Sequence, residues 1–288
     1  MSFNSKNIIT LIFQHWTLYT RSISHKLFSY INPYTIMNFE IAIPSYNRFE
    51  ILKNKTLKLL QSYHINIDKI KIFVKNEEQR DMYIESIGTD YHFILTGCEG
   101  IMETRNFLRT YYREQQETDF VLYMDDDITK FQKMCENVPD FVDTVNYMFS
   151  KMKELGLYLG APSAYNNKFY MNTKITTSLK YCIGAFQLEI IDREREEIHC
   201  DIGHFEDFQF TMDYFLRDGG VVRFNEYNIV TKYFELVGGI CGQLGGMEPR
   251  QIEMNENAEY LVNRYPNMCS QKLKRWGMDL RLNFRYQL

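Results

Sequence analysis

Hydrophobic and polar residues follow two different patterns along residues 39–124. Short apolar runs predict strands, and the segments between them repeat apolar residues at helical spacing. Strands are expected at Phe39–Ile43, Ile70–Val74, Tyr91–Leu95 and Phe120–Met124. Helices are expected at 51–60, Glu77–Ile87 and 101–116. Strands that alternate with helices form βαβ units, so we expect an α/β, Rossmann-like fold with a mostly parallel central sheet flanked by helices.

The alternation is weaker after Asp127, where we expect a smaller C-terminal region. Helices are predicted near 139–154 and 205–217, and strands near 157–161, 180–190 and Val221–Phe224. A glycine-rich stretch follows at 238–246. It is predicted to be either a flexible lid that closes over a bound ligand or an ordinary surface turn.

Residues 1–36 differ from the rest, because they contain basic residues and no acidic one. They could be a targeting segment, an accessory helix, or a stretch that precedes the true start at Met37. We favour the last two, because Met37 directly precedes the first strand. The predicted domains are therefore an extension at 1–36 and a main domain at 37–288, with halves at 37–130 and 131–288.

Composition narrows the classes of function. The 288 residues carry a formal net charge of −4, which excludes a uniformly basic surface but leaves room for a local basic patch. No apolar run approaches the roughly 18 residues of a membrane span, so we expect no stable membrane insertion. The six cysteines form no CxxC pair. We therefore expect a reducing, cytoplasmic location without a zinc site or a disulfide framework.

Two polar clusters follow predicted strands, at the edge where parallel sheets bind ligands. They are Ser45–Arg48 and Asp125–Asp127. Adjacent carboxylates repel one another, and a hard divalent cation offsets that repulsion. Mg²⁺ takes one or two carboxylates together with substrate phosphates, so Asp125 and Asp127 are the predicted ligands. A solvated acidic turn or a helix N-cap is the alternative.

Two further candidates lie on predicted helices. Glu206–Asp207 opens the helix near 205–217, where a carboxylate could act as a general base or simply compensate the helix dipole. Arg105 could bind phosphates through its guanidinium or could be a surface arginine. His204 could be a ligand or an acceptor contact, although a single histidine is more often structural.

The order of these motifs resembles the GT-A nucleotide-sugar glycosyltransferases. The residues that carry the resemblance are Ile41–Arg48, Thr104–Asn106, Tyr123–Asp127 and Glu206–Asp207. More narrowly, other segments resemble the viral and phage TET/JBP-associated glycosyltransferases, which are thought to add sugar to hydroxylated DNA bases. These segments are Thr176–Tyr181, Gly219–Asn225, Thr231–Phe234 and Tyr260–Pro266. The resemblance covers about residues 38–285.

The resemblance implies roles for individual residues. Asp125 and Asp127 would hold Mn²⁺ or Mg²⁺ against the diphosphate of a nucleotide sugar, which we expect to be a UDP-sugar. In inverting members the aspartate of this pair is the base, which here would be Asp207 with Glu206 beside it. The sequence does not decide between inversion and retention. Many GT-A enzymes have a late histidine ligand, but no histidine follows His204 in this chain. The donor is expected against Pro44, Ser45, Tyr46, Asn47, Arg48, Arg105, Asp125 and Asp126.

The acceptor is suggested by segment 264–288, which holds six basic residues, one acid and Trp276. Such a mixture suits phosphate tracking and base stacking, and a solvated tail has the same composition. The primary hypothesis is transfer of a hexose to a hydroxymethylated pyrimidine in DNA, in the cytoplasm, nucleus or viral factory of an infected cell. The alternatives are a glycan, lipid or protein hydroxyl as acceptor, or an inactive binding module. The sequence does not predict an oligomeric state.

Overall fold

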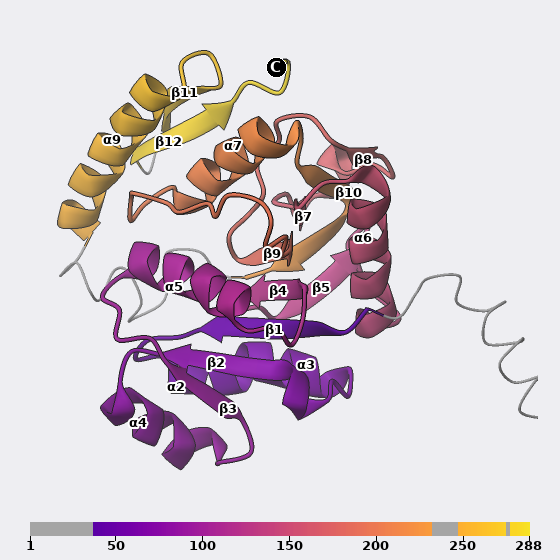
Figure 1. Ribbon diagram of the computed structural model, residues 1–288, viewed down its shortest axis with the longest axis vertical. Helices are drawn as coiled ribbons and strands as arrows, with labels where there is room; N and C mark the ends of the chain where they lie inside the picture. The colour runs from indigo at the N-terminus through magenta and orange to yellow at the C-terminus, as the bar shows by residue number, and fades with distance from the viewer. Residues whose placement is uncertain (1–36, 232–246, 275–276) are drawn as a thin grey trace, which may run out of the picture. The chain divides into compact units, whose positions relative to one another are not determined.

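The computed structural model describes residues 37–231, 247–274 and 277–288 (Figure 1). The predicted extension at 1–36, the glycine-rich stretch at 238–246 and Trp276 lie outside these residues. The described chain forms one large sheet with helices on both faces and a separate two-stranded sheet near the C-terminus. The α/β architecture predicted from the sequence is confirmed.

The first half of the chain builds four parallel strands in the order β3-β2-β1-β4. The strands are β1 (Phe39–Pro44), β2 (Ile70–Val74), β3 (His92–Leu95) and β4 (Phe120–Met124). Helices connect them, as the alternating pattern predicted. The helices are α2 (Phe49–Leu52), a π-helical segment (Lys53–Leu57), α3 (Lys58–Ser62), α4 (Glu77–Ile87) and α5 (Ile101–Glu114), with a 3₁₀ turn at Ile67–Lys69.

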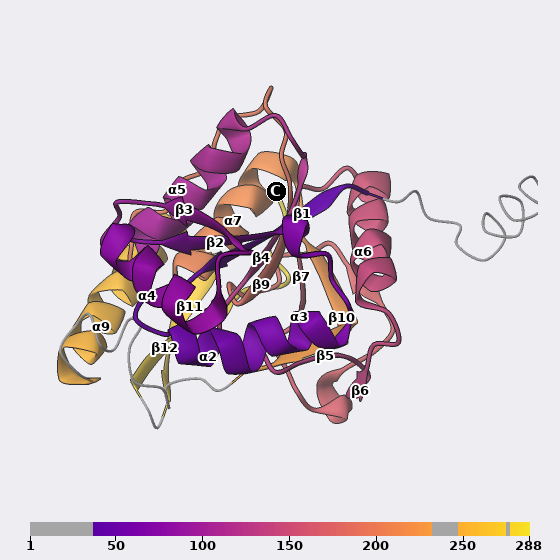
Figure 2. The same cartoon turned by 90° about the horizontal axis from the view of Figure 1, so that it is seen from below.

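Alternation within the strands determines which helix covers which face. Ile41 and Ile43 of β1 pack with α2 and α3 in the main core. Ala42 points the other way and packs with Leu108 and Tyr112 of α5 in a second cluster. Successive side chains of a strand lie on opposite faces, so an apolar strand of this kind requires cover on both sides. Figure 2 shows α2 and α3 on one side of these strands and α5 on the other.

The second half completes the sheet in the order β4-β9-β7-β10-β5-β6, with β8 paired to β10. Strands β9, β5 and β8 run against the others, so most strands remain parallel. The elements are β5 (Lys130–Lys133), β6 (Glu136–Asn137), α6 (Phe141–Leu155), β7 (Leu159–Ser163), η3 (Lys168–Tyr170), β8 (Ile175–Thr176), β9 (Phe186–Ile190), α7 (Glu206–Asp218) and β10 (Val222–Val230).

The strand predicted at 180–190 is wrong over its first residues, because β9 begins only at Phe186. The preceding backbone donors are bound by helix α7 instead of by a neighbouring strand. The amide of Cys182 donates to Thr211 Oγ1 at 3.1 Å, and the amide of Gly184 donates to Asp207 Oδ2 at 3.0 Å. A loop therefore replaces the strand and connects the sheet to the start of α7.

The C-terminal segment is not a solvated tail over its described residues. It forms a hairpin of β11 (Cys269–Lys274) and β12 (Gly277–Leu282), which contacts α9 (Met247–Arg264). Figure 1 shows α9 lying along this hairpin. Polar residues dominate the sequence of β11, so its pattern does not predict a strand.

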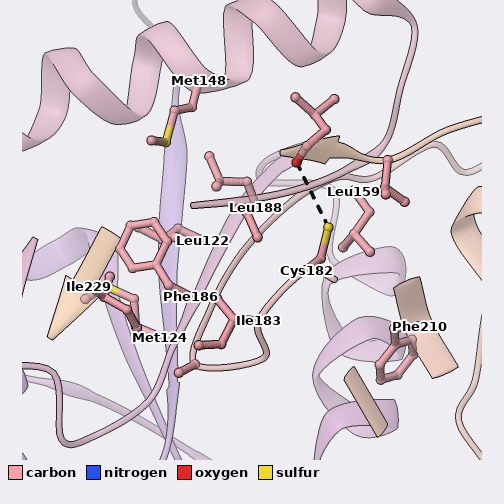
Figure 3. Packing of buried hydrophobic residues seen from close by; sticks show 14 of the residues in the cluster. Leu122, Met124, Met148, Leu159, Cys182, Ile183, Phe186, Leu188, Phe210 and Ile229 are labelled. Atoms are coloured by element: carbon pink, nitrogen blue, oxygen red, sulfur yellow. Dashed lines mark hydrogen bonds between the residues drawn. The ribbon is translucent and has the colours of Figure 1, made fainter. Parts of the chain in front are cut away.

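The core of the second half lies between the sheet and helices α6 and α7. Figure 3 shows Leu122 and Leu188 of adjacent strands beside Met148 of α6, with Phe210 of α7 further along. The Cys182 thiol also lies in this core and contacts the carbonyl oxygen of Val222. All cysteines in the described ranges are free thiols. No helix in those ranges is long and apolar enough to cross a membrane.

Candidate active site

The two predicted polar clusters meet at one edge of the sheet. β1 pairs in parallel with both β2 and β4, so the chain leaves β1 toward one side and returns on the other. Ligands of open α/β sheets bind at such a reversal, outside the carboxyl ends of the strands. Ser45 follows β1 and Asp125 follows β4, so both lie at this edge.

The middle aspartate connects the two clusters. Asp126 accepts a hydrogen bond from Ser45 Oγ at 2.6 Å, and its other oxygen lies 2.9 Å from Arg48 Nη1. Arg48 also reaches Asp127 at 3.0 Å. Burial raises the pKa of Asp126 to about 7, although Arg48 and Ser45 oppose the rise. Asp126 therefore joins the loop after β1 to the end of β4.

Tyr83 of α4 supports the same loop. Its hydroxyl lies 2.7 Å from Ser45 Oγ and accepts a hydrogen bond from the Arg48 amide at 3.1 Å. Tyr83 is fully buried. Its contacts fix the loop that carries Ser45 and Arg48, and nothing in the local sequence distinguished it from other aromatic core residues.

Arg105 lies on α5 at the floor of a small pocket. It is 3% exposed, and its Nη2 donates to Asp125 Oδ1 at 2.6 Å. Within the described part of the chain, its Nη1 has no hydrogen-bond partner. A buried guanidinium donor without a partner costs free energy, so this atom is suited to bind an anionic oxygen of a ligand.

The small pocket has a volume of about 160 Å³ and collects most of the predicted donor residues. It is lined by Pro44, Ser45, Tyr46, Arg48, Phe73, Lys75, Thr96, Cys98, Gly100, Ile101, Thr104, Arg105, Asp125, Asp126 and Glu206. Lys75 adds a third cation to its wall, beside Arg48 and Arg105. A phosphate would therefore meet positive charge as well as the carboxylates of the aspartate cluster.

Two predicted ligand-binding residues do not line this pocket. Asn47 is exposed and accepts a hydrogen bond from Gln79 Nε2 at 2.7 Å, with φ of 54°. Asp127 is bound by Arg48 and by the hydroxyl of Thr231, which follows β10. Asn47 thus shapes the loop after β1, and Thr231 connects the aspartate cluster to the far half of the sheet.

The carboxylates fit a divalent cation that is shared with a substrate. Among the residues described, no group of three or more His, Cys, Asp or Glu side chains forms a metal cage. Mg²⁺ and similar ions require only one or two carboxylates where phosphates and water supply the other ligands. Asp125 has a side chain 35% exposed and lines the pocket, so it is placed to share an ion with a diphosphate.

Asp207 is held by three donors at the N-terminus of α7. Its Oδ2 accepts hydrogen bonds from the Tyr181 hydroxyl and from the Gly184 amide, the latter at 3.0 Å. Its Oδ1 accepts from the Phe208 amide at 2.9 Å. Burial raises the pKa of Asp207, and these hydrogen bonds oppose the rise by stabilising the ionised form.

Replacing Tyr181 with phenylalanine is expected to shift the pH dependence of any reaction in which Asp207 accepts a proton. Loss of the hydroxyl removes a bond to the ionised carboxylate, so the pKa of Asp207 should rise further. The acidic limb of the kcat/KM profile should move to higher pH, whereas the KM for the donor should stay unchanged. Superimposable pH profiles for the two proteins would contradict this role for Tyr181.

Glu206 lies between two pockets. It lines the small pocket and also a much larger cavity of about 980 Å³, of which Asp207 forms part of the wall. Its carboxylate lies 3.9 Å from Arg105 Nε. Burial, together with repulsion from Asp207, raises the pKa of Glu206 to about 8. The two cavities are therefore separated by an acid that holds a proton near neutral pH.

Replacing Glu206 with glutamine is expected to stabilise the protein at alkaline pH. The folded-state pKa is raised, so the stability linked to protonated Glu206 is complete below about 4.5 and is lost as pH rises through about 8. One pKa unit corresponds to about 1.4 kcal/mol. The linkage between these two pKa values is at most about 5 kcal/mol, so we expect the free energy of unfolding of the variant to gain a few kcal/mol on that of wild type between pH 5 and pH 9. Denaturant unfolding at pH 5 and pH 9 measures the free energies of unfolding of the two proteins. The same difference between variant and wild type at both pH values would refute the prediction.

The large cavity is rich in basic and aromatic side chains. The basic residues are Lys180, Arg223, Arg250, Lys272, Lys274 and Arg281. The aromatic residues are Tyr165, Tyr170, Tyr181, Phe205, Phe208 and Phe284. Its walls come from α7, α9, β10, the hairpin, the loop before β9 and the loops around η3. His204 also lines it, and its buried Nδ1 lies 3.2 Å from Glu253.

No family model and no curated protein matches the chain. Similar solved structures include a mannosyltransferase, PcManGT from Pyrobaculum calidifontis, in complex with GDP-Man and Mn²⁺. Its identity is 12%, with 81% of this chain and 66% of that chain covered and a TM-score of 0.45.

Two further similar structures are a synthase and TarS. Glucosyl-3-phosphoglycerate synthase from Mycobacterium tuberculosis, in complex with Mn²⁺ and UDP-glucose, is 11% identical over 85% of this chain and 86% of that chain, with a TM-score of 0.48. S. aureus TarS is 14% identical, with 79% of this chain and 66% of that chain covered and a TM-score of 0.42. The chain spans just under two thirds of the mannosyltransferase and of TarS. At these identities, its function has to be argued from its own side chains.

Proposed function

We propose that the protein is a metal-dependent glycosyltransferase that transfers a hexose from a nucleotide sugar to a hydroxymethylated pyrimidine in DNA. One observation carries the proposal. Glu206 and Asp207 stand where a small anion-binding pocket meets a large basic and aromatic cavity. A group-transfer enzyme needs such an arrangement, because donor and acceptor must meet at one general base.

The small pocket suits the diphosphate of the donor. Arg105 offers an unpartnered guanidinium donor, and Lys75 lies on the same wall. Asp125 would hold Mn²⁺ or Mg²⁺ beside the phosphates, and Asp127 would join it by exchanging its bonds to Arg48 and Thr231 for the cation. When bound, such a cation neutralises the charge that develops on the leaving diphosphate. Ser45 and Arg48, fixed by Asp126 and Tyr83, would position the nucleotide.

Asp207 is suited to act as the base. Its carboxylate is held in one orientation by Tyr181 and by two backbone amides. In the transfer it would take the proton of the acceptor hydroxyl while that oxygen forms a bond to the sugar carbon. The bond between sugar and diphosphate breaks in the same step, and the pair of electrons leaves with the phosphate oxygen.

The composition of the large cavity supports DNA as the acceptor. Cationic side chains on α9 and the hairpin can bind phosphates, and aromatic rings can stack on a base. A base within a duplex would have to leave the stack to reach Asp207. The segments that resemble the TET/JBP-associated glycosyltransferases include Thr176–Tyr181 and Thr231–Phe234, which contain the partners of Asp207 and Asp127.

Nucleoside mass spectrometry tests the proposal. DNA that contains hydroxymethylcytosine or hydroxymethyluracil would be incubated with the protein, Mn²⁺ and a set of nucleotide sugars, beside the Asp207→Asn variant. A mass gain of one hexose that is absent with the variant is the expected result. Release of nucleoside diphosphate without modified DNA would instead indicate a glycan, lipid or protein acceptor, and absence of both would favour an inactive binding module.

A further inference from the structure

Three exposed aromatic rings stand together on the loop after β7. Tyr165 is 58% exposed, Phe169 84% and Tyr170 60%. The ring centroids of Tyr165 and Tyr170 lie 5.5 Å apart, and those of Phe169 and Tyr170 lie 5.1 Å apart. Large apolar groups gathered in solvent mark interaction sites, because each exposes apolar area that water solvates poorly. We call residues 165–170 the aromatic loop.

The aromatic loop is held by hydrogen bonds at several points. The side chain of Asn167 accepts from the Phe169 amide at 3.0 Å, and the Tyr170 amide donates to the Asn167 carbonyl at 3.0 Å. Asn166 accepts from Asn228 of β10 at 3.0 Å. The exposed Phe169 therefore stands on a loop that is hydrogen-bonded within itself and joined to β10 through the side chain of Asn166.

The loop borders the cavity that contains Asp207. Tyr165 and Tyr170 line this cavity, whereas Phe169 is not among its lining residues. Basic residues from β10, α9 and the hairpin line the same cavity. An aromatic projection beside a cationic groove matches the chemistry of a nucleic acid, whose phosphates are anionic and whose bases stack.

We propose that Phe169 is a wedge that enters the base stack of duplex DNA and fills the space left by an extruded base. Proteins that unstack DNA insert apolar side chains between base steps in this way. Tyr165 and Tyr170 then offer stacking faces along the wall that leads to Asp207. The inference rests on the proposed function, and it assigns a separate residue to the step that makes a duplex base accessible.

The test compares Phe169→Ala with wild type on the same hydroxymethylcytosine sequence as duplex and as single strand. Transfer to the duplex should fall at least tenfold, and transfer to the single strand should fall less than threefold, because a single strand needs no extrusion. Phe169→Trp should restore transfer to the duplex. Leu155→Ala, an exposed residue at the end of α6 outside the cavity lining, is the control and should match wild type.

A second measurement separates failure of the wedge from failure of the proposed function. The fluorescence of 2-aminopurine placed beside the target base should increase when wild type binds the duplex. The increase should be small when Phe169→Ala binds. No increase with bound wild type would overturn the wedge, as would equal transfer by Phe169→Ala and wild type on the duplex. An equal loss of transfer by Phe169→Ala on duplex and on single strand would also overturn the wedge. Wild type that modifies neither DNA would overturn the proposed function instead.

Discussion

Replacing Asp207 with asparagine is expected to lower kcat for sugar transfer by about 10²–10⁴-fold, the usual contribution of a general base. Asparagine keeps the shape of the side chain and can still accept from the Gly184 amide, but it cannot accept a proton from the acceptor hydroxyl. Binding of the donor should not change, because Asp207 lines the large cavity and not the small pocket. Steady-state kinetics with a coupled assay for nucleoside diphosphate measures the effect.

The control for this substitution is Asp213→Asn on the same helix. Asp213 accepts a hydrogen bond from Tyr265 at 2.6 Å and is not among the residues lining either cavity. Its substitution should leave kcat within about threefold of wild type. The role of Asp207 would be excluded if Asp207→Asn kept most of the activity in a folded protein with unchanged circular dichroism.

The second large effect is expected when Asp125 is replaced with asparagine. Asparagine can still accept a hydrogen bond from Arg105, so the fold should persist, but the charge that would hold the cation is lost. We expect Mn²⁺-dependent affinity for the nucleoside diphosphate, and transfer with it, to fall by about 10²–10³-fold, as for loss of one strong electrostatic contact. Isothermal titration calorimetry with and without Mn²⁺ measures the binding component.

Removal of the metal provides the matching control. With a chelator present, wild type and Asp125→Asn should bind the nucleoside diphosphate equally weakly, since the difference between them depends on the cation. Asp119→Asn, at the opposite end of β4 and 57% exposed, should behave as wild type under both conditions. A difference between wild type and Asp125→Asn that survives the chelator would argue against a shared metal ion.

The first half of the fold could be predicted from the sequence because its information is local. β2, β4 and α4 have the bounds expected from apolar runs and helical spacing. The clusters at Ser45 and Asp125 could be placed together for the same reason, since parallel strands bring their carboxyl ends to one edge.

The second half depends on contacts between distant residues, which the pattern does not contain. Tyr181 and Thr231 bind the predicted aspartates from loops 26 and 104 residues away in sequence. β5 has a lysine at each end, β8 has only two residues, and β11 is mostly exposed, so neither alternation nor an apolar run marks them. Polar residues that follow a strand, such as Thr231, are the signal that could have located these partners.

The order of strands also has a consequence for synthesis of the chain. β4 is complete at Met124, but β9, which pairs with it on the side away from β1, begins only at Phe186. β5 likewise pairs with β10, which is synthesised much later. During translation the apolar edge of β4 therefore stays unpaired while about 60 further residues emerge. An exposed edge of this kind can pair with another chain. Slow elongation or truncation before β9 should accordingly favour aggregation over folding, even though every element of the first half of the sheet, β1 to β4, has been made.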